Sequence, residues 1–187
     1  MTTVQVPMMR RIGMKQYLKD KHVPCSVLQL DYNYDAKMLF ILPDPGKMEE
    51  VEASLTPQVL EEWKHSLENS KDYKIIDFYL PKFSISATYQ LQQLLLPLGF
   101  TELFSPSANF SNISEQQNIN VLQGFHKAML EVNERGPKAG PHTGFHVFRM
   151  SSLRYPSITF NRPFVTIIYS NNTNDILFMG KVVNPTI

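Results

Sequence analysis

The chain has 187 residues, of which 43% are hydrophobic and 19% charged, and its formal net charge is +1. This composition is typical of one globular domain with a core and excludes a disordered chain. The near-zero charge gives no attraction to nucleic acid, and no run of about 18 apolar residues would span a bilayer. We therefore predict neither a nucleic-acid nor a membrane partner, and we find no apolar segment of a signal peptide in this chain.

The first third of the chain predicts strands followed by two helices. Residues 3–9 alternate like a strand, and residues 23–34 and 37–43 read as a hairpin. Residues 48–55 have apolar side chains at helical spacing. A second helix is predicted to start at Thr56-Pro57, with the threonine as N-cap and the proline in the first turn. Its apolar stripe, which indicates core contact, is Val59, Leu60, Trp63 and Leu67.

The rest of the chain reads mainly as sheet. Residues 74–86 have apolar side chains on both faces, so we expect a long strand covered on both sides. Residues 91–98 predict a short helix closed by Gly99. Residues 121–132 alternate, and they place His126 on the apolar face, where we expect a buried, hydrogen-bonded imidazole. Residues 158–169 and 176–183 are apolar strands. The predicted fold class is α+β, dominated by sheet.

The sequence gives little indication of a catalytic site or a metal site. A thiol nucleophile would combine Cys25, the single cysteine, with one of four histidines. Those histidines are His22, His126, His142 and His146. Cys25 lies in a strand pattern with nothing that would lower its pKa, so it reads as a small buried hydrophobe. His142 and His146 have helical spacing, but glycine and proline surround them, and we predict no metal and no cofactor.

Three glycosylation sequons point to secretion. They begin at Asn109, Asn112 and Asn171, and each lies in a polar, turn-like stretch. One such tripeptide would carry little weight in a chain of this length. Three of them in predicted loops favour an extracellular glycoprotein.

Six sequence blocks resemble the serpin family of serine protease inhibitors. In chain order they are Val6-Pro7-Met8-Met9, Met38-Leu39-Phe40-Ile41-Leu42-Pro43, Tyr79-Leu80-Pro81-Lys82-Phe83, His126-Lys127-Ala128, Phe160-Asn161-Arg162-Pro163-Phe164 and Phe178-Met179-Gly180-Lys181-Val182. Within the family, the chain resembles the secreted antitrypsin and antichymotrypsin group. The resemblance gives structural roles to His126, Asn161, Pro163 and Phe164, while Thr166 departs from the apolar residue usual in the family.

The resemblance implies the C-terminal half of a serpin domain over residues 1–187. That half contains strands of sheets B and C, two strands of the central sheet, a few short helices and an exposed reactive-centre loop at residues 133–157. The N-terminal half of a serpin domain would be absent, as in a fragment. Without it, strand edges would stay unpaired, so the chain is expected to be a monomer or prone to aggregation.

In serpins a protease attacks one bond of the loop, and the loop then inserts as a strand of the central sheet and distorts the protease. Counting from the hinge glycine, Gly136, places the reactive bond at Met150-Ser151, which suits elastase-like or chymotrypsin-like enzymes. A shift by one residue gives Arg149-Met150 and trypsin-like enzymes.

The hinge of the loop departs from that of inhibitory serpins. It includes Glu134, Gly136, Pro137 and Pro141, where inhibitors have a small threonine or serine followed by alanines. Proline has no N–H for a strand ladder, so these prolines oppose insertion. The resemblance thus implies a serine-type endopeptidase inhibitor and not an enzyme. The alternative is a non-inhibitory or inactive serpin, either substrate-like or a carrier that binds another partner.

Overall fold

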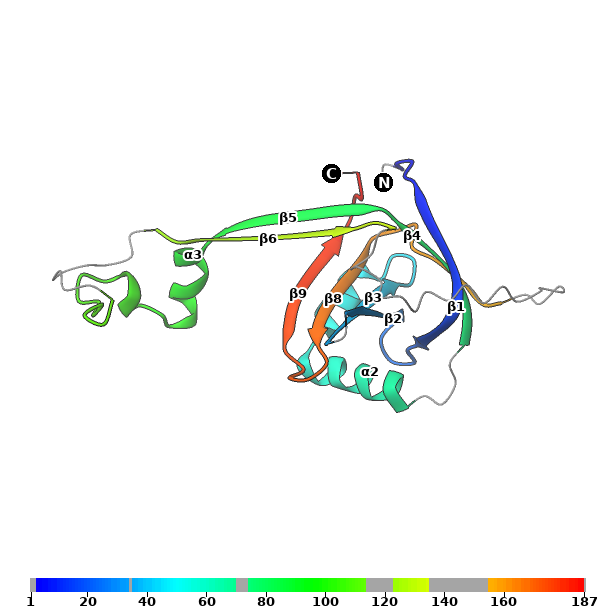
Figure 1. The fold of residues 1–187 in the computed structure, drawn as a ribbon, viewed down its shortest axis with the longest axis horizontal. Helices are drawn as coiled ribbons and strands as arrows, with labels where there is room; N and C mark the ends of the chain where they lie inside the picture. The colour runs from blue at the N-terminus through cyan, green and yellow to red at the C-terminus, as the bar shows by residue number, and fades with distance from the viewer. Residues whose placement is uncertain (1–2, 34, 70–73, 114–122, 135–154, 187) are drawn as a thin grey trace. The chain divides into compact units, whose positions relative to one another are not determined.

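The computed structural model describes residues 3–33, 35–69, 74–113, 123–134 and 155–186 (Figure 1). The chain forms two compact units. The first comprises residues 1–84 and 131–187, and the second comprises residues 85–130.

The first unit contains a seven-stranded sheet in the order β7-β4-β1-β2-β3-β8-β9 (Figure 1). Its strands are β1 (Met8–Lys19), β2 (Cys25–Asn33), β3 (Ala36–Pro43), β4 (Lys74–Pro81), β7 (Ser157–Thr159), β8 (Phe164–Ser170) and β9 (Ile176–Val182). All neighbours pair antiparallel except β4 and β7, which are parallel. The predicted hairpin is confirmed as β2–β3.

Two helices follow the hairpin, α1 (Met48–Ser54) and α2 (Pro57–Asn69). The Thr56 hydroxyl accepts a hydrogen bond from the Val59 backbone N–H at 3.3 Å, which confirms the predicted N-cap. The α2 stripe packs on β2, β3 and β8, and the largest side chains in this core are Trp63 and Tyr169. The stripe is therefore core, as the periodicity indicated.

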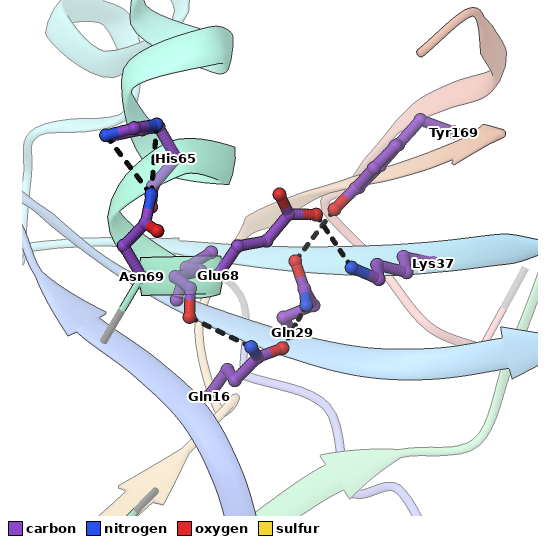
Figure 2. A network of polar contacts seen from close by, with 8 residues as sticks. Gln16, Gln29, Lys37, His65, Glu68, Asn69 and Tyr169 are labelled. Atoms are coloured by element: carbon purple, nitrogen blue, oxygen red, sulfur yellow. Dashed lines mark hydrogen bonds and ion pairs between the residues drawn. The ribbon is translucent and has the colours of Figure 1, made fainter. Parts of the chain in front are cut away.

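A polar network closes the end of this core (Figure 2). The Tyr169 hydroxyl donates to Gln29 Oε1 at 2.8 Å, and the Gln29 amide donates to Gln16 Oε1. Gln16 Nε2 in turn donates to the Leu67 carbonyl of α2 at 2.9 Å. Burial raises the pKa of Tyr169, which stays a neutral donor. The network joins β8, β2, β1 and α2 and satisfies polar groups that burial would otherwise penalise.

The opposite face of the sheet carries an aromatic cluster. Phe164 lies 5.3 Å from Phe160, 5.5 Å from Phe83 and 6.2 Å from Phe40, measured between ring centroids. Such spacings and tilted planes are those of favourable ring pairs. Phe83 lies just after β4 and Phe160 directly follows β7, so the cluster fixes the chain at both points.

Four expected strands differ from the observed ones. The strand expected at residues 3–9 is wrong for residues 3–7, which lie outside the sheet, because β1 begins at Met8, where its pairing with β4 starts. Residues 74–86 are not one strand, because β4 ends at Pro81 and β5 (Phe83–Gln90) begins after Lys82. The expected burial of both faces is wrong for β4, which alternates between buried and partly exposed residues. Residues 158–169 likewise divide into β7 and β8, and β6 (Phe125–Val132) starts later than the predicted residue 121.

The second unit contains short helices and most of a β5–β6 ribbon. The helices are α3 (Leu91–Leu95), η1 (Leu96–Leu98) and η2 (Glu102–Phe104). Gly99 ends the α3–η1 segment at φ 91°, the left-handed conformation expected for it. His126 is exposed, so its predicted burial is wrong. Among the described residues β6 pairs with β5 alone, and a two-stranded ribbon cannot enclose an imidazole.

The outer strand β9 leaves apolar side chains exposed. Ile176, Leu177, Phe178 and Met179 are each more than a third exposed. In the part of the chain that the structure describes, β9 pairs only with β8. An apolar edge of this kind favours self-association, and the predicted tendency to aggregate stays a prediction.

Candidate functional site

The predicted reactive loop is described at its two flanks. Glu134 lies within the described residues. The other predicted residues of this stretch lie outside the described residues. They are the hinge positions Gly136, Pro137 and Pro141, the reactive-bond candidates Arg149, Met150 and Ser151, and the two histidines considered for a metal site, His142 and His146. The described part of the site therefore consists of the residues that hold the chain before residue 135 and after residue 154.

The first flank is held by an ion pair. Glu134 follows β6, and its carboxylate lies 2.5 Å from Nζ of Lys82. The hydrogen bond from Lys82 lowers the pKa of Glu134. Lys82 stands between β4 and β5, and its backbone N–H donates to the Pro7 carbonyl at 3.2 Å. Both charged side chains are exposed, so the pair positions the flank more than it stabilises the fold.

The second flank is held by backbone pairing on β4. The Asp77 N–H donates to the Pro156 carbonyl at 3.0 Å, and the Phe160 N–H donates to the Tyr79 carbonyl at 2.9 Å. Between these bonds β7 pairs in register with β4, with Ser157 opposite Asp77. Both flanks therefore depend on β4. The second flank pairs with this strand, and Lys82, which holds the first flank, directly follows its last residue.

The predicted structural residues after β7 differ in their burial. Phe164 is buried in the aromatic cluster, Pro163 is half-buried and Asn161 is exposed. Arg162 Nε donates to the Pro43 carbonyl at 2.7 Å and so fastens this block to the end of β3. Phe164 and Arg162 hold the block to the sheet.

A second charged cluster lies on β4 beside the second flank. Arg10 binds Asp77 through both carboxylate oxygens, at 3.0 Å and 2.9 Å. The guanidinium also lies over the Tyr79 ring, 5.5 Å from its centroid. The hydrogen bond from Arg10 lowers the pKa of Asp77, which stays ionised near neutral pH.

The burial of Cys25 excludes it as a catalytic nucleophile. Cys25 is fully buried, and burial raises the pKa of its thiol to about 12. A protonated, enclosed thiol cannot act as a nucleophile at neutral pH. Across the described ranges, no group of three or more His, Cys, Asp or Glu side chains could hold a metal ion. No helix in those ranges is long and apolar enough to cross a membrane.

The three sequon asparagines are exposed. Asn109, Asn112 and Asn171 all lie at the surface, the last in the turn between β8 and β9. Asn109 Oδ1 accepts a hydrogen bond from the Ser111 N–H at 3.0 Å. Their accessibility is compatible with glycosylation, which stays a prediction.

The comparisons with known proteins agree with one another. The family described as Serpin (serine protease inhibitor) matches residues 1–185. Human kallistatin is 46% identical over 187 residues, a match that covers 99% of this chain and 44% of kallistatin. A mouse serine protease inhibitor is 44% identical over 185 residues, covering 98% of this chain and 44% of the relative.

The fold of this chain is also similar to a solved structure. The structure of human thyroxine-binding globulin with thyroxine superposes with a TM-score of 0.83 at 38% identity, and it covers 98% of this chain and 47% of that chain. The sheet and its loop flanks thus define a partial serpin domain. The chain belongs to the serpin family, in the antitrypsin- and antichymotrypsin-like group, and it spans less than half the length of the curated relatives it matches.

Sequence reasoning missed Lys82, Arg10 and Asp77 as site residues. Lys82 stands within one of the six serpin-like blocks, but its partner Glu134 is distant in the chain. Arg10 and Asp77 are likewise distant in the chain, 67 residues apart, so the sequence gives no sign that they form an ion pair. Only the pairing of β1 with β4, which brings Arg10 beside Asp77, could have predicted the second pair.

Proposed function

We propose that residues 133–157 act as a bait loop for a serine endopeptidase, with Met150-Ser151 as the attacked bond. The observation that carries the proposal is the fixation of both flanks. Lys82 holds Glu134 on one side, and β4 holds Pro156 and Phe160 on the other. A loop with fixed ends presents its middle to a protease at low entropic cost.

Residue chemistry sets the class of protease. A methionine before the attacked bond suits an elastase-like or chymotrypsin-like primary pocket, and the alternative bond Arg149-Met150 suits a trypsin-like one. Such enzymes act outside the cell, so the proposed setting is extracellular, with Asn109, Asn112 and Asn171 as glycosylation sites.

The hinge decides the fate of the protease after cleavage. Pro137 and Pro141 lack the N–H groups that an inserted strand would donate. Slow insertion gives the protease time to hydrolyse the acyl bond and leave. We therefore propose that this loop behaves as a substrate and does not trap the enzyme.

Incubation with neutrophil elastase, chymotrypsin or trypsin is expected to give one cut within residues 133–157 and free, active protease. Intact-mass analysis would locate the bond, and SDS gels would reveal any covalent adduct. Met150→Gly is the matched variant: it should abolish cleavage at 150–151 by elastase and chymotrypsin while the fold remains.

Two outcomes would contradict parts of this proposal. An SDS-stable adduct would overturn the substrate-like behaviour and make the chain a working inhibitor. Resistance of the whole loop to all three proteases, with cleavage elsewhere, would overturn the bait-loop function itself.

A second candidate function is that of a carrier, and a specific pocket favours it. A cavity of about 270 Å³ lies between α2 and β9, with Leu60, Ile176 and Met179 among its walls. Lys64 lines it with its side chain buried, 2.9 Å from Glu61 Oε1 and 3.3 Å from the Asn174 carbonyl. The walls are largely apolar beside the Lys64–Glu61 ion pair, so they suit a small apolar molecule with a carboxylate that competes with Glu61 for Lys64.

Thyroxine is the probe for this pocket, because it combines aromatic rings with a carboxylate and is bound by a structural relative. Titration should quench the fluorescence of Trp63, the single tryptophan, one residue from Lys64. Lys64→Met should weaken binding about tenfold or more through loss of the charge. Lys47→Met, on an exposed lysine just before α1, is the control. Equal affinity of both variants and the wild type for thyroxine would exclude this pocket as the binding site.

A further inference from the structure

Gln5 is an exposed glutamine in a stretch of chain that belongs to no strand or helix. Residues 3–7 precede β1 without regular secondary structure, and the Gln5 side chain lies at the surface. Among the described residues its amide has no hydrogen-bond partner, and the backbone of residues 4–6 makes no hydrogen bond to them either. The amide and the backbone around it are therefore open to an enzyme that approaches from solvent.

The stretch is held at one end and kept extended. The Pro7 carbonyl accepts a hydrogen bond from the Lys82 N–H at 3.2 Å, and β1 begins at the next residue, Met8. Proline fixes its own φ and biases the residue before it, Val6, to an extended conformation. Gln5 is thus two residues from a fixed point, at most about 7 Å of extended chain.

The residues around Gln5 suit recognition as an extended peptide. Residues 3–9 contain no charged side chain, and Val4 and Met8 are 39% and 36% exposed. An enzyme that binds a substrate strand uses main-chain hydrogen bonds for affinity and pockets for alternate side chains. Residues 4–6 supply free main-chain groups, and the apolar neighbours of Gln5 supply side chains for such pockets.

Other described glutamines are held by regular structure. Gln16 and Gln29 belong to the polar network at the end of the core, and Gln29 is 2% exposed. Gln58 is exposed but lies in α2, where its amide donates to Glu62 Oε1 at 3.1 Å. A helical glutamine of this kind becomes an extended substrate only after local unfolding, which costs free energy that Gln5 does not require.

The remaining described glutamines lie in or beside the second unit's elements. They are exposed, and they are Gln90 at the end of β5, Gln92 and Gln93 in α3, and Gln123 two residues before β6. Experiment can distinguish them from Gln5, because cleavage after Arg10 releases a peptide of residues 1–10 in which Gln5 is the only glutamine.

We propose that Gln5 is the acyl donor in a transglutaminase reaction that joins this chain to a lysine of another protein. The cysteine thiolate of the transglutaminase attacks Cδ of Gln5, and the bond from Cδ to Nε2 breaks. The nitrogen takes up the proton that the thiol had given up and leaves as ammonia, so that a thioester remains.

The second half of the reaction transfers the acyl group. The neutral amine of the lysine attacks the thioester carbon, the thiolate leaves and regains a proton from the amine, and an isopeptide bond remains. One lysine amine is consumed and one ammonia is released, with no oxidation or reduction. This inference does not depend on the bait loop: it adds a covalent attachment point at residues 3–7 and leaves residues 133–157 unmodified.

The test incubates the full chain with tissue transglutaminase, calcium and dansylcadaverine, a fluorescent primary amine. After trypsin digestion, most of the label is expected on the peptide of residues 1–10. Gln5→Asn should lower the rate of incorporation about fivefold or more, because asparagine keeps the amide but places its carbon one bond closer to the backbone, away from the thiolate. Gln58→Asn is the matched control, and its rate should equal that of the wild type.

Four results would overturn the proposal. They are an unlabelled wild-type chain, label confined to other glutamines such as Gln92 or Gln123, an undiminished rate for Gln5→Asn, and an equal loss for Gln58→Asn. Equal thermal midpoints of the three chains establish that the fold is unchanged, as expected for an exposed amide without a partner. Cleavage of residues 133–157 by elastase should be the same for Gln5→Asn and the wild type, so failure of the bait-loop function is seen separately.

Discussion

Replacement of Trp63 by alanine is expected to lower the free energy of unfolding by about 3–5 kcal/mol, the range for deleting a large buried aromatic side chain. Trp63 is 1% exposed and lies at the centre of the core between α2 and the sheet. Its indole Nε1 also donates to Asp20 Oδ2 at 2.7 Å. Asp20 Oδ1 accepts from the His22 and Val23 N–H groups, both at 2.7 Å, so the indole braces the turn between β1 and β2.

Urea denaturation followed by circular dichroism measures this change, because the variant has lost the only tryptophan. Trp63→Phe is the matched control: it keeps an aromatic ring and removes the N–H, so it should cost less than the alanine variant. A loss below about 1 kcal/mol for the alanine variant would contradict the burial on which the prediction rests.

The helix that carries Trp63 was predictable from the sequence because its signals are local. Thr56 and Pro57 define its start, and the apolar stripe repeats within four turns. The β2–β3 hairpin was predictable for the same reason, since the two strands are neighbours in the chain. Capping, periodicity and short connections are all contained in a window of a few residues.

The strand breaks were not predictable in this way. A largely apolar run at residues 74–86 hides the break at Lys82, because tertiary pairing ends the strand there and Pro81 is the only local sign of it. His126 was misplaced because alternation identifies two faces of a strand but does not say whether anything covers them. Both errors concern partners that lie far away in the chain.

Thr166 was predictable from the sequence in part. The sequence marks it as unusual for the family, and the structure shows the consequence: its Oγ1 is buried and, among the described residues, has no hydrogen-bond partner. An unsatisfied buried hydroxyl costs about 1–3 kcal/mol relative to a satisfied one. The sequence could identify the position but could not show the cost.

The candidate site depended on resemblance more than on physical patterns. Gly136, Pro137 and Met150 have a meaning only in the register of a serpin loop, since composition alone reads as a surface loop. The structure adds Lys82 and the β4 contacts that hold the flanks. Those contacts hold the residues on either side of the proposed loop, and the proposed bond rests on the sequence alone.

Phe164→Ala is expected to cost about 3–5 kcal/mol and, in addition, to loosen the second loop flank. Phe164 is 2% exposed, and its ring contacts those of Phe40, Phe83 and Phe160. Phe160 directly follows β7, and its N–H donates to the Tyr79 carbonyl. A cavity at Phe164 removes the packing that keeps Phe160 in place, so β7 should separate from β4 more often.

Urea denaturation measures the global loss, and amide hydrogen exchange at Phe160 measures the local one. Phe164→Leu is the control: it keeps most of the apolar volume, so it should cost less and protect the Phe160 amide better. If Phe164→Ala lowered stability while protection of the Phe160 amide fell no further than that of amides in β2, the cluster would stabilise the sheet without anchoring the flank. Faster exchange confined to Phe160 and its neighbours would instead link the aromatic cluster to loop presentation, because the fixed end of the bait loop would then depend on a single ring.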